Sequence, residues 1–200
     1  MSKISDADIL EMWDRQKCAE VLSKYCRALD RADLPLMKSV YWEDAIDVHG
    51  VFEGNAHEFS EFIITEIKNW FEIATHYICN VHMEYHGNEM YSEAYLISYC
   101  QVAGTKEKVE TVFGPTYLSQ LGDNVGEEHK QAFFMGGRYL DKLDKRDGEW
   151  RIARREVVMD WNENWPANSI LNEGMLKNLQ VRGCWGKKDP VYRNKPTLLE

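Results

Sequence analysis

Residues 76–85, HYICNVHMEY, mark the point at which the hydrophobic periodicity of this sequence changes. From Tyr77 to Tyr85 every second residue is apolar or aromatic and most residues between them are polar, which is the pattern of a strand with a polar second face. Helical spacing dominates the sequence before this stretch, and antiparallel strand patterns dominate after it. This order favours an α+β domain in which helices pack on one side of an antiparallel sheet.

Three helices are predicted before this strand. Apolar residues recur at helical spacing from Ser5 to Leu29, so the first helix is expected there. A second, shorter helix opens at Asp33 and runs towards Trp42. After a short extended piece over residues 46–54, Asn55 can cap a third helix with an apolar face.

Further strands are predicted after it. The turn HGNE leads into a strand over residues 90–104, and the aromatic-rich residues 111–121 are expected to extend or follow that strand. The charged run 122–130 is expected to be a loop. A final hairpin turns at RDGEW and joins residues 131–146 to 150–161. These patterns predict one domain over residues 1–161, and a C-terminal extension, 162–200, that packs on the domain or on a neighbouring subunit.

Composition limits the classes of partner and the compartment. The chain has 200 residues, a formal net charge of -9 and 44% hydrophobic residues. An acidic field attracts neither nucleic acid nor an anionic membrane surface, so neither is expected as a partner. Five scattered cysteines without a CxxC pair predict a reduced, cytoplasmic setting. No stretch has the apolar length of a membrane span, and the first residues lack the apolar run of a signal peptide.

Four residues form a candidate set for proton abstraction. Tyr25 and Asp30 lie at the end of the first helix, His76 begins the polar-faced strand and Arg138 follows a Gly-Gly pair. An aspartate can fix the tautomer of a histidine and make it a general base, and an arginine or tyrosine can stabilise negative charge on oxygen. Each residue also has a structural interpretation. Asp30 alone is more often a helix terminator or cap, and His76 alone is more often a hydrogen-bonded structural histidine. His82, predicted on the same face of the strand, competes with His76 for any role.

Other residues give less support to catalysis or to a cofactor. Arg138 is most simply one partner of a cross-strand ion pair. No P-loop or GxGxxG motif occurs, so no nucleotide or other cofactor is expected. A metal site has little support, because the remaining histidines are predicted to be surface or turn residues: His49, His57, His86 and His129.

Three segments together resemble the SnoaL-like branch of the nuclear transport factor 2-like superfamily. They are KYCRALDRADLPLMKSVYWEDAIDVHG, THYICNVHME and GGRYLDKLDKRDGEWRIARREVVMDW, and the resemblance covers about residues 8 to 161. It implies a cone-shaped α+β barrel, in which a curved antiparallel sheet is wrapped by N-terminal helices around a deep pocket. It also implies assembly as a homotrimer or homodimer. Some members of this family are cofactor-free lyases, including dehydratases and a dehydrochlorinase, that use an Asp–His pair.

The resemblance assigns roles to particular residues. It places the paired aspartate at Asp30, the histidine at His76 and the pocket arginine at Arg138, with Tyr25 as a further catalytic residue. Residues that match or neighbour the family's pocket wall are assigned to substrate binding: Trp42, Ile78, Asn80, Phe134 and Tyr139. The segment 104–131 departs from short family members and is expected to form a lid or an oligomer contact.

The function expected from these residues is a cofactor-independent dehydratase or isomerase. Its substrate would be a cyclic apolar molecule such as a steroid, a polyketide or an aromatic-degradation intermediate. Two alternatives remain open at this point, because fold does not settle function. The chain is then either a non-catalytic binding or structural subunit, or a dehydrohalogenase with the same base and a different leaving group.

Overall fold

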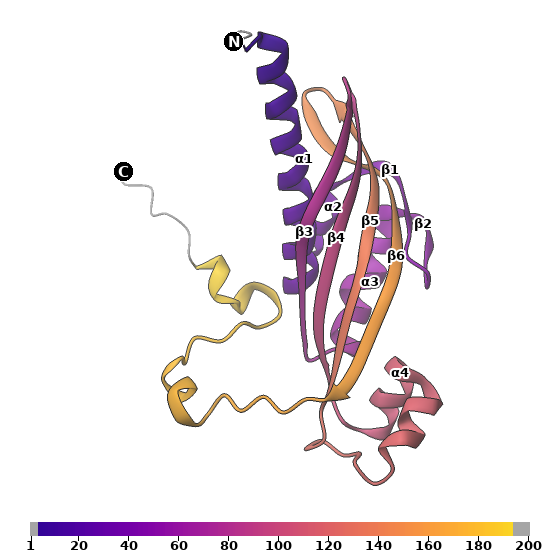
Figure 1. Cartoon of the computed structure of the whole chain (residues 1–200), viewed down its shortest axis with the longest axis vertical. Helices are drawn as coiled ribbons and strands as arrows, with labels where there is room; N and C mark the ends of the chain where they lie inside the picture. Colours follow the sequence, from indigo (N-terminus) through magenta and orange to yellow (C-terminus); the bar gives the residue numbers. More distant parts are fainter. Residues whose placement is uncertain (1–3, 194–200) are drawn as a thin grey trace.

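The computed structural model describes residues 4–193, and within them a sheet is wrapped on one side by helices (Figure 1). In Figure 1, α1 runs beside β3, α2 and α3 lie behind the sheet, and α4 lies at the lower end. The helices are α1 (Asp6–Arg31), α2 (Leu34–Ser39), α3 (Ala56–Trp70) and α4 (Lys106–Leu121). The strands are β1 (Tyr41–Val48), β2 (Glu53–Asn55), β3 (Ile73–His86), β4 (Glu89–Val102), β5 (Gln131–Arg146) and β6 (Glu149–Pro166).

Side-chain caps set where the N-terminal helices begin. Ser5 caps α1 in a capping box with Asp8, and Asn55 caps α3 by accepting from the backbone of His57 and Glu58. Asp33 caps α2, in which Pro35 occupies the first turn, as expected. The second helix stops at Ser39, however, because β1 already begins at Tyr41, so Trp42 lies on a strand.

The sheet has the strand order β2-β1-β6-β5-β4-β3 and is mostly antiparallel. The pair β1–β6 is parallel, so the expected all-antiparallel sheet is corrected at this one pair. The long hairpins β3–β4 and β5–β6 were both predicted, and β6 runs to Pro166, past residue 161. Buried apolar side chains between the helices and the covered face of the sheet form the core.

A β-bulge in β3 changes which residues share a face. Ile78 pairs with Leu96 and Val81 with Ala94, so β3 has one extra residue between these pairs. As a result Ile78 and Val81 both pack against the core, whereas Asn80 is exposed. The strict alternation read from the sequence, with His76, Ile78 and Asn80 on one face, therefore holds only up to Ile78.

The segment expected to extend or follow the strand of residues 90–104 forms the helix α4. Thr105 caps this helix, and Gly114 interrupts it with φ 84 and ψ 172. Pro115 then opens the second half, where a missing backbone N–H is tolerated. The charged run that follows is a loop, as predicted, apart from short turns.

Beyond β6 the chain runs along the molecule in an extended path with three short 3-10 helices: η1 (Gly174–Asn178), η2 (Gly186–Lys188) and η3 (Pro190–Tyr192). In Figure 1 this segment leaves the lower end of β6 and turns back towards α1. It is fastened there by Asp33, which accepts hydrogen bonds from Lys187 Nζ and Tyr192 Oη at 2.6 Å each.

Candidate active site

Asp30 and His76 are in direct contact. His76 Nδ1 lies 2.6 Å from Asp30 Oδ1, and the His76 backbone N–H donates to Asp30 Oδ2 at 3.1 Å. Asp30 lies inside the last turn of α1, which runs to Arg31 and ends with Ala32 in a left-handed conformation (φ 49). The aspartate is only 8% exposed, so both its oxygens depend on His76 for hydrogen bonds that water would otherwise supply.

His76 also lines a cavity of about 480 Å³ beneath the helices. Its Nε2 makes no hydrogen bond within residues 4–193, and this nitrogen is therefore available to a molecule in the cavity. Most of the wall is apolar, including Leu29, Ile63, Ile67, Trp70, Phe71 and Phe133. Such a wall, with few polar groups, suits an apolar ligand of modest size.

The cavity contains one thiol, which is not a nucleophile in this setting. Burial raises the pKa of Cys100 to about 12, and the hydroxyl of Ser98 lies 3.4 Å from its sulfur. Attack by cysteine requires the thiolate.

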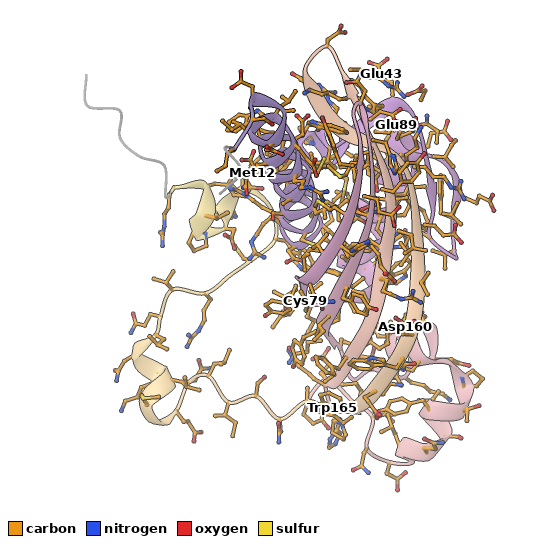
Figure 2. The ribbon with its side chains drawn as sticks, turned by 45° about the horizontal axis from the view of Figure 1, so that its top comes forward. Met12, Glu43, Cys79, Glu89, Asp160 and Trp165 are labelled. Carbon is orange, nitrogen blue, oxygen red and sulfur yellow. The ribbon has the colours of Figure 1, made fainter. Side chains whose placement is uncertain are left out.

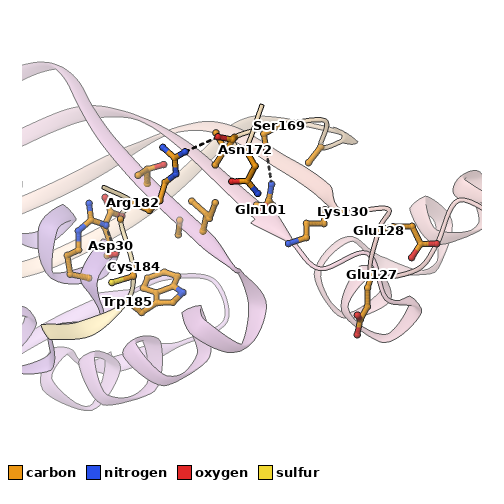
Figure 3. Close-up of a pocket in the computed structure, with 17 residues that line it drawn as sticks. Asp30, Gln101, Glu127, Glu128, Lys130, Ser169, Asn172, Arg182, Cys184 and Trp185 are labelled. Atoms are coloured by element: carbon orange, nitrogen blue, oxygen red, sulfur yellow. Dashed lines mark hydrogen bonds between the residues drawn. The ribbon is translucent and has the colours of Figure 1, made fainter. Parts of the chain in front are cut away.

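Asp30 borders a second, more polar cavity of about 720 Å³, which the C-terminal segment helps to enclose. Figure 3 shows Asp30 near Cys184 and Trp185 of that segment, with Lys130, Glu127 and Glu128 farther along the cavity. The Asp30–His76 pair thus stands between two cavities, with the carboxylate bordering the polar one and the imidazole bordering the apolar one.

Tyr25 is wholly buried beside an arginine that sequence reasoning did not select. The guanidinium of Arg155 lies 3.9 Å from the ring centroid of Tyr25 and 4.0 Å from that of Tyr139. Both oxygens of Asp141 accept from Arg155 at 2.7 Å. Burial raises the pKa of Tyr25, and its hydroxyl has no hydrogen-bond partner in the described part of the chain. Tyr25 is not among the residues that line the apolar cavity, whereas Tyr139 is.

Arg138 lies away from this cavity, contrary to expectation. Alternation along β5 puts Tyr139 on the covered face and Arg138 on the opposite one. There Arg138 binds Asp160 through Nε and Nη2 and Glu93 through Nη1, each at 2.9 Å. Asp160 is labelled on β6 in Figure 2. Arg138 is thus a partner in cross-strand ion pairs, which is the simpler of the two interpretations of its sequence position.

Four residues assigned to the pocket wall also lie outside the apolar cavity. The Trp42 ring stacks with the guanidinium groups of Arg146 and Arg151 at 4.9 and 4.7 Å. Phe134 packs on Trp161 and Trp165 on the other face of the sheet. The bulge in β3 turns Asn80 outward, and Ile78 packs against the core without bordering the cavity.

His49, predicted to be a surface or turn residue, borders the same cavity as His76. Its Nδ1 lies 3.1 Å from Oδ1 of Asp47, which is wholly buried. A sequence signal existed: Asp47 and His49 are two residues apart at the end of a strand, so they share a face with the buried Ala45.

Within residues 4–193, no three His, Cys, Asp or Glu side chains gather in an arrangement that would hold a metal ion. Nor does that part of the chain contain a helix with the length and apolar character needed to cross a membrane.

Comparison with known proteins gives a family and a set of similar folds. The model of the SnoaL-like domain matches residues 10–156. A hexachlorocyclohexane dehydrochlorinase (LinA) of type 2 is 14% identical, with a TM-score of 0.65 over 84% of this chain and 99% of that one. A putative scytalone dehydratase from Novosphingobium aromaticivorans is 15% identical, with a TM-score of 0.58 over 83% and 95%.

A third structure carries the superfamily name. A nuclear transport factor 2-like protein from Salmonella enterica serovar Typhimurium is 18% identical, with a TM-score of 0.54 over 80% of this chain and 95% of that one. At these identities the likeness concerns the fold. No curated protein matches the chain.

Proposed function

The chain belongs to the SnoaL-like family, and from this premise we propose that it is a cofactor-independent lyase, in the first place a dehydratase, or an isomerase. The substrate is a cyclic apolar small molecule that fills the cavity of about 480 Å³. The observation that carries the proposal is the 2.6 Å contact between Asp30 Oδ1 and His76 Nδ1 at the wall of that cavity.

In the proposed reaction His76 Nε2 removes a proton from carbon. Asp30 holds the proton on Nδ1, so that the lone pair of the ring is on Nε2, and it stabilises the imidazolium that forms. The apolar surroundings strengthen this interaction, because little water competes with it. In a dehydratase the electrons of the C–H bond form a double bond as the neighbouring C–O bond breaks. In an isomerase the proton returns to another carbon.

Tyr25 and Arg138 have no direct part in this mechanism. The hydroxyl of Tyr25 is enclosed next to Arg155, and Arg138 is held by two carboxylates on the far face of the sheet. The names of the similar structures, a dehydrochlorinase and a putative scytalone dehydratase, support elimination as the reaction class. Assembly of this chain into a trimer or dimer stays a prediction.

A general probe for a base in an apolar cavity is 5-nitrobenzisoxazole. Removal of its ring C–H proton opens the ring and releases a coloured phenolate that needs no proton. Wild-type protein should accelerate this reaction, and His76→Asn should slow it by about 10²- to 10⁴-fold, the range typical of general base catalysis. The asparagine amide can still donate to Asp30 but has no basic nitrogen in the cavity.

The matched control is His82→Asn. His82 lies on the same strand, but its side chain is 70% exposed and points away from the core. It should retain the wild-type rate. Wild-type protein that is no faster than His76→Asn would contradict the proposal. Saturable binding of the probe without ring opening would favour the alternative of a non-catalytic binding module.

A further inference from the structure

A second Asp–His pair, Asp47 with His49, presents its imidazole to the apolar cavity. His49 follows β1 directly, in a turn closed by a hydrogen bond from its own backbone N–H to Phe52 O at 2.8 Å. Its Nδ1 faces Asp47 Oδ1 at 3.1 Å, and the other oxygen of Asp47 accepts from Tyr41 Oη at 2.6 Å. The carboxylate of this pair is wholly buried, and Arg155 neighbours it across the β1–β6 pair.

Two contacts fix the ring of His49, one at its face and one at Nδ1. It stacks on Phe59 of α3, with centroids 4.6 Å apart and planes 25° from parallel, and its side chain is 19% exposed. With Nδ1 directed to Asp47, the ring leaves Nε2 without a hydrogen bond in residues 4–193. A polar nitrogen at an apolar wall is unfavourable unless a ligand or water satisfies it.

The two imidazoles reach the cavity from opposite ends of the sheet. The strand order is β2-β1-β6-β5-β4-β3, so His49 comes from the β1 end and His76 from the β3 edge. An elimination needs a base at one carbon and a proton donor at the leaving group of the neighbouring carbon. Two separately anchored imidazoles on one cavity wall supply both kinds of group, a base and a proton donor.

A purely structural role for His49 explains less. Asp47 already accepts from Tyr41, and a donor to its second oxygen could come from a side chain that stays outside the cavity. His49 instead adds its ring to the cavity wall. The carboxylate of Asp47 also lies where it offsets the charge of a protonated imidazole.

We propose that His49 is the general acid that protonates the departing hydroxyl group, so that the preferred substrates are β-hydroxy ketones or related cyclic alcohols. This role rests on the proposed lyase function. His76 Nε2 takes the proton from the carbon next to the carbonyl, and the C–H electrons form the new C=C bond. The C–O electrons leave with the oxygen, which receives a proton from His49 Nε2 and departs as water. Solvent exchange then returns a proton to His49 and removes one from His76.

The test compares two leaving groups on one ring. 3-Hydroxycyclohexanone and 3-acetoxycyclohexanone both give cyclohexenone, whose absorbance reports the rate, but acetate departs without a proton. In His49→Asn the ratio of the rate with the alcohol to the rate with the acetate should fall by about 10²-fold or more. His76→Asn should lower both rates together, because both reactions need the base.

A pair of substitutions separates proton donation from positioning. Asn at position 49 keeps an amide at the place of Nδ1, facing Asp47, whereas His49→Gln keeps one nearer the place of Nε2. A catalytic acid is lost in both variants, while a merely structural contact with Asp47 is lost mainly in His49→Gln. His57→Asn is the matched control, since His57 lies on α3 outside the cavity wall.

The outcomes distinguish the two proposals. An unchanged ratio in His49→Asn, or equal loss with both substrates, would overturn the acid role and leave the base intact. Wild-type conversion of the acetate but not of the alcohol would overturn it as well. If His76→Asn matched wild-type protein with both substrates, the lyase function itself would fail.

Discussion

At the scale of single residues, Arg155 and Arg138 lie on neighbouring strands but in opposite environments. Arg155 is wholly buried, and its guanidinium is held between two tyrosine rings and two oxygens of Asp141. A buried pair of this kind is not a large net source of stability, because both charges are desolvated. Its importance is that removing either partner leaves the other charge buried and unpaired, directly behind Tyr139 on the cavity wall.

The substitution Asp141→Asn should therefore lower the free energy of unfolding by about 3–5 kcal/mol. Breaking the exposed ion pairs of the other strand with Arg138→Gln should have a much smaller effect, because solvent screens them. Urea unfolding of both variants, followed by far-UV circular dichroism, measures the difference. If both variants lost the same free energy of unfolding, burial of the Arg155–Asp141 pair would not make its loss more costly than that of an exposed pair.

At the scale of elements, one carboxylate connects the first helix to three strands. Asp14 of α1 accepts hydrogen bonds from Lys145 of β5 at 2.8 and 3.0 Å, from Trp150 of β6 at 2.8 Å and from Tyr85 of β3 at 3.1 Å. Its residue is only 1% exposed. Burial alone would raise the pKa of Asp14, but these donors outweigh it and hold the pKa below 3.8.

This shift predicts a pH dependence of stability. A carboxyl group with a lowered pKa in the folded state stabilises the fold above its unfolded pKa of about 3.8, and the contribution is lost as pH falls through the folded value. Asp14→Asn should therefore lower the free energy of unfolding by about 1.5–3 kcal/mol at neutral pH. The gap between variant and wild type should close as pH falls below 3.8. Denaturant titrations over that range measure it, and a gap that widened in acid would contradict this assignment.

The helices and strands show which parts of the fold the sequence could predict and which it could not. Caps and periodicity predicted α1, α3 and both long hairpins, because these signals are local. The segment with Phe113 and Tyr117 is predicted to extend or follow a strand because aromatic and β-branched residues favour strands, whereas in the structure it is helical and Pro115 opens the second half of the helix. Local preference was overridden there by capping and by the break at Gly114.

The residues of the candidate site also include some that could be predicted and some that could not. The contact of Asp30 with His76 was expected from a family resemblance, and no periodicity in the chain implies it. The resemblance places Arg138 in the pocket, whereas the alternation of β5, anchored on buried Tyr139, puts it on the opposite face. The sequence predicts His49 to be a surface or turn residue, whereas it shares the buried face of Asp47.

At the scale of the whole molecule, the C-terminal segment returns to the first helix and encloses the polar cavity beside Asp30. Hydrogen bonds and ion pairs hold it there: Tyr192 and Lys187 with Asp33, Asp189 with Arg31 at 3.3 Å, and Trp185 Nε1 with Glu72 O at 3.1 Å. Burial and the neighbouring carboxylate of Asp33 raise the pKa of Tyr192 to about 12, so its hydroxyl keeps the proton that it donates. Most of this segment is otherwise exposed, and these few contacts therefore decide how firmly it is held.

The substitution Tyr192→Phe removes the donor to Asp33 while keeping the ring. Because a hydrogen bond to a charged acceptor contributes about 1.5–3 kcal/mol, local opening of the segment should become at least about tenfold more frequent. Amide hydrogen exchange at residues 184–193 measures that opening, and the amides of Cys184 and Val191, which both donate to Asp189, are the reporters. The core strands β4 and β5 should keep their protection and serve as the internal control. Faster exchange throughout the sheet would mean that the C-terminal segment supports the whole fold. Unchanged exchange at Cys184 and Val191 would mean that contacts other than the Tyr192–Asp33 hydrogen bond hold this segment beside the carboxylate of Asp30.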